Sequence, residues 1–418
     1  MKLSGCARRF SMAGVPVVGN IATGAIVGLT SEGAELCDRM LGSDVAKQDI
    51  PASCGPLVSY LDSAGFIDKG AQEHSAYTSA YLHVTNRCNL ACTGCYSANA
   101  ARNVASDPTL KDLFHALDTL AQLGVNRLVI SGGEPFARDD LADVLGAARE
   151  VGFSRITVIT NGVLCTPDRV GSLSGLVDLI AVSFDGASAQ ARAWLRGSQL
   201  FDVLAEAVHT CKDASIPVQV LPTLHAHNID DVPAYIELAD SMGATLGFSL
   251  LSGDPDVLGE LMPNEHDVRH LAEVMAAAVR QSPSISGHDS TGPSSQLAAR
   301  ISCGASRCGC SVAADGALYP CHMLMMSPFA LGNVFTDSVD DVRCALDSFR
   351  LPCVEDLASC SSCDVCYLCG GGCRARAFMA SGALDGPDPY CGYYRRALEI
   401  AIDEFLSGVG GGGGEHAV

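Results

Sequence analysis

Three cysteines stand close together in the first quarter of the chain. The stretch RCNLACTGCYSAN (residues 87–99) places Cys88, Cys92 and Cys95 within eight positions. A structural zinc site is normally closed by four protein ligands, whereas a four-iron cluster held by three cysteines leaves one iron open to a small molecule. The spacing therefore predicts a metal centre with a free coordination position, and a zinc site is the alternative.

Composition narrows the class of protein. The chain has 418 residues, of which 48% are hydrophobic, and its formal net charge is −20. Such a chain can bury a sizeable core, and it lacks the clustered Lys and Arg on which binding to a nucleic acid depends. No run of 18 uncharged apolar residues occurs, and the N-terminus has neither a long apolar segment nor a credible cleavage site. We therefore expect a cytoplasmic protein with no membrane and no nucleic-acid partner.

Apolar runs typical of strands alternate with helical patterns between residues 78 and 252. The six strand-like runs are AYLHVT, NRLVISGG, RITVITNG, LIAVSFDG, PVQVLPTL and TLGFSLLS. Strands that each lead into a helix or crossover form parallel βα units, whose active end lies at the strand C-termini. Six units rather than eight predict an α/β fold built on a partial (β/α)6 barrel of the TIM type. The turns SGGEP, TNG and SFDG follow three of these strands, and their glycines allow the backbone to approach a ligand.

The regions on either side of the predicted barrel have other patterns. Residues 1–75 carry two short apolar runs, GVPVVGN and GAIVGL, and then two helical patterns, the first capped by Thr30 or Ser31. This order predicts a small α+β module. Residues 76–280 form the predicted barrel, and the Ser, Gly and Pro between 281 and 300 predict a linker. Residues 301–400 are dense in cysteine, and 401–418 contain the end of a C-terminal helix and a Gly-rich tail that we expect to be disordered.

The ordered motifs of the barrel resemble those of the radical S-adenosylmethionine (SAM) superfamily. CxxxCxxC follows the first predicted strand, GGEP (132–135) the second and SFDG (183–186) the fourth. The resemblance implies that the three cysteines hold a 4Fe-4S cluster whose open iron chelates SAM, and that an electron from the cluster cleaves SAM to a 5′-deoxyadenosyl radical. By position, it assigns SAM binding to Gly132, Gly133, Glu134, Pro135, Ser183, Asp185 and Arg196. The residue before the third cysteine is usually aromatic in this family, and here it is Gly94.

A second group of cysteines resembles the SPASM extension of the same superfamily. The chain has 20 cysteines, too many and too clustered to suggest disulfides in a protein without a signal peptide. The resemblance implies two auxiliary 4Fe-4S clusters, and therefore three clusters in all. The first would be held by Cys303, Cys321, Cys373 and either Cys308 or Cys310. The second would be held by Cys360, Cys363, Cys369 and Cys391.

Two alternatives stay open for this second group. Cys363, Cys366, Cys369 and Cys373 also have the ferredoxin spacing, in which the fourth cysteine serves the neighbouring cluster. That register would make Cys366 a ligand in place of Cys360. Paired C-x2-C motifs are also typical of zinc ribbons.

The reaction that the resemblance implies is an oxidative modification of a peptide or protein. Members of the SPASM family act mostly on such substrates, and auxiliary clusters can accept the electron that is released when a new bond forms. The N-terminal module resembles the winged-helix element that binds the leader of ribosomally made peptides by adding a strand to a sheet. Our leading hypothesis is a peptide maturase that binds a leader and forms an intrapeptide crosslink, with a thioether favoured. Its electron donor would be of the flavodoxin or ferredoxin type.

Other hypotheses remain. One is a maturase or oxidase of a folded protein, similar to sulfatase maturases, or of a peptide-derived cofactor. Another is a non-catalytic iron-sulfur electron carrier or redox sensor. The GGEP segment argues against it, because an electron carrier does not need to bind SAM. A DNA-binding winged helix is the alternative for the N-terminal module. The sequence identifies no general acid or base, and we expect packing or hydrogen-bonding roles rather than ligand roles for four histidines: His83, His225, His227 and His322.

Overall fold

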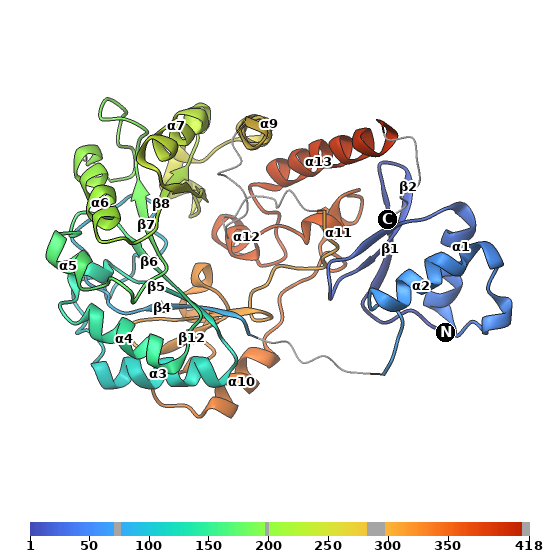
Figure 1. Cartoon of the computed structure of the whole chain (residues 1–418), viewed down its shortest axis with the longest axis horizontal. Helices are drawn as coiled ribbons and strands as arrows, with labels where there is room; N and C mark the ends of the chain where they lie inside the picture. The colour runs from blue at the N-terminus through green and yellow to red at the C-terminus, as the bar shows by residue number, and fades with distance from the viewer. Residues whose placement is uncertain (71–76, 197–199, 282–296, 412–418) are drawn as a thin grey trace.

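A mostly parallel sheet forms the centre of the molecule in the computed structural model, which describes residues 1–70, 77–196, 200–281 and 297–411 (Figure 1). Its parallel strands are β4 (Ser79–His83), β5 (Arg127–Ser131), β6 (Arg155–Thr160), β7 (Leu179–Phe184), β8 (Val218–Leu224) and the short β9 (Thr245–Leu246) and β10 (Ser249–Leu250). The spatial order β10-β8-β7-β6-β5-β4 follows the chain in reverse, and β9 also pairs with β8. The predicted partial barrel is confirmed.

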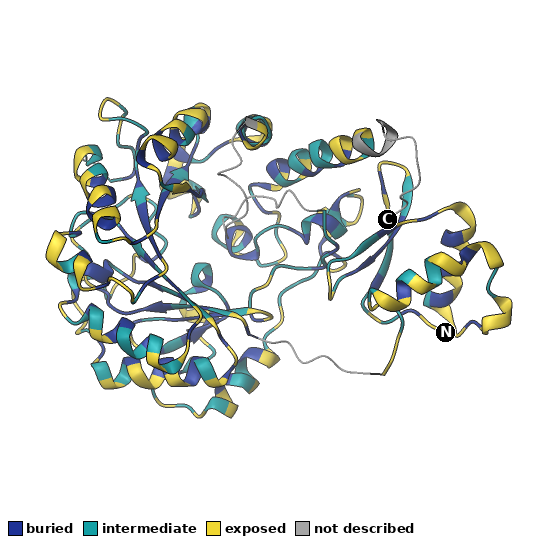
Figure 2. Ribbon diagram, in the orientation of Figure 1, coloured by how far each residue is buried: buried dark blue, intermediate teal, exposed yellow. Residues whose placement is uncertain are grey.

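Helices cover the outer side of this sheet (Figures 1 and 2). They are α3 (Leu110–Gln122), α4 (Leu141–Val151), α5 (Pro167–Gly171), α6 (Phe201–Asp213), α7 (Val232–Met242) and α9 (Glu265–Gln281). The short α8 (Pro255–Leu258) lies instead beside the cysteine loop, where Leu258 packs with Leu195 and Leu251. Leu82, Ile130 and Val158 are fully buried in the core that the strands share with these helices. Because side chains alternate along a strand, Tyr81 and His83 on β4 face the interior of the barrel instead.

The cysteine-rich region extends the same sheet, which the sequence did not predict. Its strands are β11 (Gly309–Val312), β12 (Ala317–Tyr319) and β13 (Gly332–Asn333). β11 runs parallel to β4 and places Cys310 opposite Ala80. Strands of two to four residues are too short for a periodic pattern to reveal them. The helices α10 (Val339–Ser348), α11 (Cys366–Cys369), α12 (Arg374–Ser381) and α13 (Cys391–Gly411) follow.

The N-terminal part is a three-stranded antiparallel sheet followed by two helices. The strands β1 (Ala7–Met12), β2 (Val15–Asn20) and β3 (Ile26–Gly28) pair in that order, before α1 (Ser31–Gly42) and α2 (Gly55–Ser63). The expectation of two strands missed β1, since Arg8 and Arg9 interrupt its apolar pattern. Thr30 caps α1 as expected, and its side chain accepts a hydrogen bond from the Gly33 N–H.

This small sheet packs against the cysteine-rich region (Figure 1). Met12 and Val17 share an apolar cluster with Leu368, Leu398 and Ile402 of α11 and α13. Arg8 forms an ion pair with Glu355 at 2.6 Å in the same contact. The predicted linker falls mainly on 282–296 and the end of the Gly-rich tail on 412–418, both outside the described residues. No helix in the described ranges has the length and apolar character needed to cross a membrane.

Tyr390 ties the cysteine-rich region to the end of the barrel and generates a first prediction. Its hydroxyl is buried and donates a hydrogen bond to the carbonyl of Leu251, just after β10, at 2.8 Å. Tyr390→Phe removes this donor and leaves a buried carbonyl without it, so we expect unfolding to become easier by about 1–3 kcal/mol. Chemical denaturation of the intact protein measures this, with Tyr60→Phe on α2 as control. Equal stability of the two variants would contradict the role of the bond.

Candidate active site

The cysteine loop leaves the carboxyl end of β4 and is held by hydrogen bonds to its own backbone. Asn103 accepts a bond from the Cys88 N–H at 2.8 Å and donates one to the Cys88 carbonyl at 3.0 Å. Further along, the N–H of Thr93, between the second and third cysteines, donates to the Leu195 carbonyl at 2.7 Å. The loop that follows β7 therefore also fixes the position of the cysteines.

Polar groups surround the three thiols. Burial alone would raise the pKa of Cys95, but hydrogen bonds from Ser97 and Arg102 outweigh burial and lower this pKa. The Arg102 Nη2 lies 3.7 Å from the Cys95 sulfur, and the Asn161 amide lies 3.9 Å from the Cys88 sulfur. Burial raises the pKa of Cys92, with contributions from the other two thiols. Such donors stabilise thiolates, the form in which cysteine binds metal.

The glycines of GGEP allow an unusually close approach of two backbones. The N–H of Gly133 donates to the Thr85 carbonyl, and that of Glu134 donates to the Arg87 carbonyl, both at 2.8 Å. A Cβ on Gly133 would lie 2.0 Å from the Arg87 oxygen, and one on Gly132, whose φ is +131°, would lie 2.4 Å from the Thr85 oxygen. Only glycine fits at either position. Pro135 then begins a buried turn of 3-10 helix, Pro135–Ala137.

Glu134 is fully buried, and its carboxylate accepts three hydrogen bonds. The donors are the Asn161 N–H and the Thr160 hydroxyl, both at 2.7 Å, and the Phe136 N–H at 3.1 Å. Burial raises the pKa of Glu134, and the three bonds together with the charge of Arg196 oppose that rise. The carboxylate thus joins the turns after β5 and β6 to each other.

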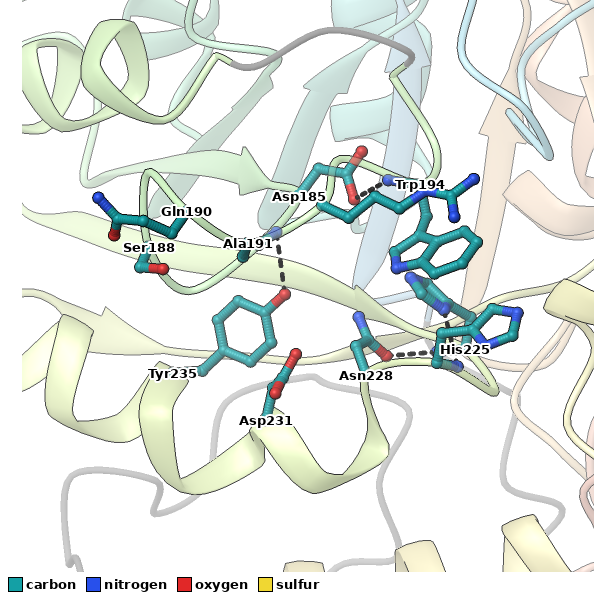
Figure 3. Close-up of a pocket in the computed structure, with 12 residues that line it drawn as sticks. Asp185, Ser188, Gln190, Ala191, Trp194, His225, Asn228, Asp231 and Tyr235 are labelled. Carbon is teal, nitrogen blue, oxygen red and sulfur yellow. Dashed lines mark hydrogen bonds between the residues drawn. The ribbon is translucent and has the colours of Figure 1, made fainter.

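Asp185 and Arg196 lie on the loop after β7 (Figure 3 shows Asp185). Both carboxylate oxygens of Asp185 accept backbone N–H groups, one from Trp194 and the other from Leu195 and Arg196. The Arg196 side chain acts electrostatically on Cys92 and Glu134. Its Nε and Nη1 atoms are buried without a hydrogen-bond partner among the described residues. Ser183 lies on β7 at the same edge of the sheet.

These residues fit a cluster that carries SAM. Three thiols share one loop, and the Arg196 guanidinium, whose Nε and Nη1 have no hydrogen-bond partner among the described residues, suits a carboxylate such as that of the methionine part of SAM. The seven predicted SAM-binding residues all lie at or beyond the carboxyl ends of β5 and β7. Within the described ranges, no three or more His, Cys, Asp and Glu side chains are arranged to hold a single metal ion.

Gly94, which departs from the family pattern, has a physical explanation. Its φ is +69°, and a Cβ at this position would lie 2.8 Å from Leu251 Cδ1 and 3.0 Å from Leu258 Cδ2. These leucines belong to a small apolar cluster with Leu195 and Leu261. Leucines of later segments thus form an apolar wall beside Gly94.

The structure separates Cys308 from Cys310 as candidates for the first auxiliary cluster. Burial raises the pKa of Cys303, and Cys373 and Cys308 raise it further. Burial, Cys373 and Cys303 likewise raise the pKa of Cys321. Cys310 lies inside the core on β11, and burial alone raises its pKa to about 12. Electrostatic interaction therefore links Cys308 to Cys303, whereas Cys310 lies in the apolar core, and this contrast favours Cys308 as the fourth ligand.

The second set of cysteines stays together, and both Cys360 and Cys366 interact electrostatically with Cys363. Burial and the thiols of Cys363 and Cys360 raise the pKa of both Cys366 and Cys391, although in Cys391 the carboxylate of Asp388 also contributes. Burial and the Cys391 thiol also raise the pKa of Cys369. Cys366 and Cys369 are the first and last residues of α11.

A buried ion pair links the two sets. Arg376 and Asp388 are both almost completely buried and meet at 2.9 Å. The Asp388 carboxylate also accepts the Cys373 N–H at 2.6 Å, and its carbonyl accepts the Cys391 N–H at 2.9 Å. One residue thereby positions a predicted ligand of each auxiliary cluster.

Two functional-looking side chains were missed from the sequence. Arg102 contacts Cys95 and Asn161 contacts Cys88, and neither side chain had been assigned a role. The turn TNG, which contains Asn161, was predicted to approach a ligand, and that signal could have identified it. The four histidines are not grouped as ligands, and His322 stacks on Tyr81 at 4.1 Å in the barrel interior.

Comparison with known proteins decides the family. The model of the radical SAM superfamily matches residues 82–239. The mycofactocin maturase MftC of Mycolicibacterium smegmatis is 32% identical over 333 residues, which cover 76% of this chain and 83% of that protein. The chain belongs to the radical SAM superfamily.

Solved structures share the fold of this radical SAM enzyme. The structure of anSMEcpe with bound AdoMet has a TM-score of 0.63 and 18% identity, over 79% of this chain and 99% of that one. The structure of Streptococcus suis SuiB bound to the precursor peptide SuiA has a TM-score of 0.58 and 14% identity, over 93% of this chain and 98% of that one. At these identities the likeness concerns the fold alone.

The close backbone contact at Gly133 generates a second prediction. Gly133→Ala places a methyl group against the Arg87 carbonyl, so the GGEP turn must move away from the cysteine loop. We expect SAM cleavage to fall at least about tenfold, since displacement of a binding loop by an ångström costs that much or more. Gly146→Ala on α4, where a Cβ meets nothing, is the control. A 5′-deoxyadenosine assay with unchanged cleavage in both variants would contradict the packing argument.

The cysteine geometry generates a third prediction. Cys308→Ser removes a proposed ligand, so we expect part of the iron to be lost from the purified protein. Cys310→Ser changes only a buried side chain and should keep its iron if it folds. Anaerobic iron and sulfide analysis with Mössbauer spectroscopy distinguishes them, and the reverse pattern would make Cys310 the ligand.

Proposed function

We propose that this radical SAM enzyme matures a ribosomally made precursor peptide by forming an intrapeptide crosslink, with a thioether favoured. Three features of one chain support the proposal: the predicted SAM-binding residues, the cysteines predicted to hold two auxiliary clusters, and a three-stranded sheet in which, among the described residues, no strand pairs with the outer edge of β3. MftC is named a maturase, and SuiB was solved with a precursor peptide, which supports a peptide substrate.

The chemistry of a thioether accounts for the extra cysteines. When bound, SAM and the cluster supply abstraction of a hydrogen atom from carbon. Joining sulfur to that carbon also releases the thiol proton and one electron. The proposed auxiliary clusters, positioned by Cys303, Cys321, Cys373 and their neighbours, would accept this electron and pass it to an external carrier of the flavodoxin or ferredoxin type.

Leader recognition is proposed at the edge of β3. The bonds Asn20 N–H to Ala25 carbonyl and Leu29 N–H to Pro16 carbonyl set the pattern of the β2–β3 pairing. Alternation along that pairing turns the N–H and C=O groups of Ile26 and Gly28 away from β2. Gly28 is exposed and has no side chain to block a neighbour, so another strand can approach closely there.

Expression together with each short open reading frame beside the gene tests the proposed function. We expect one of the encoded peptides to lose two hydrogen atoms per crosslink by mass spectrometry. Alkylation of free thiols should then be blocked at a cysteine if the product is a thioether, and should proceed normally if it is a carbon–carbon bond. Modification of a folded protein alone, with every small peptide left unchanged, would favour the protein-maturase alternative. An enzyme that never cleaves SAM would favour the electron carrier.

The open sheet edge generates a further prediction. Gly28→Pro removes an outward N–H and obstructs strand addition, so we expect affinity for the isolated leader to fall at least about tenfold. Ser11→Pro is the matched control, because Ser11 is exposed on β1 at the opposite edge. Fluorescence anisotropy of a labelled leader measures both. Loss of binding in Ser11→Pro alone would place the leader on β1, and full binding by both variants would exclude strand addition.

A further inference from the structure

A polar cavity lies between the loop after β7 and the start of α7. Its volume is about 390 Å³, which is within the range of sites for small ligands. Figure 3 shows Asp185 and Trp194 on one side and Asn228, Asp231 and Tyr235 on the other. Asp185 also holds the backbone of Arg196, so the cavity adjoins the site described above.

His225 supplies a hydrogen-bond donor that has no partner. It is the residue after β8, is only 1% exposed and lines the cavity. Its Nδ1 accepts the N–H of His227 at 3.2 Å, which places the imidazole proton on Nε2. That Nε2 is buried with no hydrogen-bond partner among the described residues. A buried N–H group without a partner is costly, so this group marks a place where a water or the polar group of a ligand binds.

The walls of the cavity exclude an aromatic ligand on Trp194. One face of the indole carries the guanidinium of Arg192 at 3.6 Å, and His227 stacks on the indole at 4.1 Å with the rings nearly parallel. These two neighbours occupy both faces available for stacking. A nucleobase therefore finds no platform here.

The charged side chains that line the cavity favour a neutral ligand. The carboxyl groups of Asp185 and Asp231 both line the cavity, which opposes a second carboxylate beside His225. The donor at Nε2 and the guanidinium of Arg192 oppose a cation. Ser188 and Gln190 offer neutral polar groups of both kinds, whereas the Asn228 amide already bonds the His225 N–H and the Thr223 carbonyl. An amide, which carries one acceptor and one donor, matches this set.

We infer that the cavity is a subsite for a neutral amide of the peptide substrate, whose carbonyl oxygen accepts the Nε2–H of His225. The inference rests on the proposed function, and it assigns the substrate residue next to the reacting one to this side of the barrel mouth. His225 is then a residue that orients the peptide, and it has no part in proton transfer.

The holoenzyme labelled with 15N-histidine tests the subsite directly. The probe is N-acetylglycine methylamide, a neutral molecule with two peptide groups, and His225→Gln assigns the signal. We expect the His225 Nε2–H resonance to shift saturably with the probe and not with acetate. The signal of His209, exposed on α6, should not move. No shift with the amide, an equal shift with acetate, or a shift with SAM in its place would overturn the inference.

Variants give a second readout with a crosslinked peptide. His225→Ala should raise KM for the peptide about 3- to 10-fold, the range for loss of one neutral hydrogen bond, and His225→Gln, which keeps an N–H donor, should restore most of the affinity. An unchanged KM in His225→Ala would overturn the subsite. If the enzyme binds the amide probe but modifies no peptide, the proposed function is contradicted and the subsite is not. If a peptide is crosslinked normally but the His225 resonance does not shift with the amide probe, only the subsite is contradicted.

Discussion

Two backbone hydrogen bonds, from Gly133 to Thr85 and from Glu134 to Arg87, are the contact on which the site depends. These bonds form only because Gly132 and Gly133 carry no Cβ. The absence of side chains lets the turn after β5 pack against the segment that leads into the cysteine loop. Glu134 is thereby buried where it can accept the Asn161 N–H, and the Asn161 side chain in turn reaches Cys88. One steric constraint thus joins three strand ends and orients a thiol.

The loop after β7 adds an independent constraint from the other side. Asp185 holds the N–H groups of Trp194, Leu195 and Arg196, and the Leu195 carbonyl accepts the Thr93 N–H from within the cysteine loop. The cysteines lie in a segment without regular secondary structure, so external contacts must supply its rigidity. Asp388 has the same role in the cysteine-rich region, where it contacts the backbone of Cys373 and Cys391.

The sequence was informative where a motif coincides with a strand end. The barrel strands, the CxxxCxxC loop and the GGEP turn were predicted because parallel strands are apolar runs and their carboxyl-end turns need glycine. The last predicted strand, TLGFSLLS, forms two short strands instead, β9 and β10. β1 was missed since Arg8 and Arg9 form ion pairs with Glu355 and Asp38, contacts that no local pattern reveals. Spacing alone could not show that Cys310 is buried in the core, because its burial arises from pairing of β11 with β4. The contact of Arg102 with Cys95 is equally a product of the fold.

We propose that Cys88, Cys92 and Cys95 form a SAM-cleaving centre distinct from the remaining cysteines. The most direct measurement compares 5′-deoxyadenosine formation and iron content, under anaerobic reduction, in the natural protein and in the variant with all three replaced by alanine. Cys344→Ala, an exposed cysteine on α10, is the control. We expect the triple variant to form no 5′-deoxyadenosine and to retain most of its iron in the cysteine-rich region. Undiminished SAM cleavage by that variant would contradict this proposal.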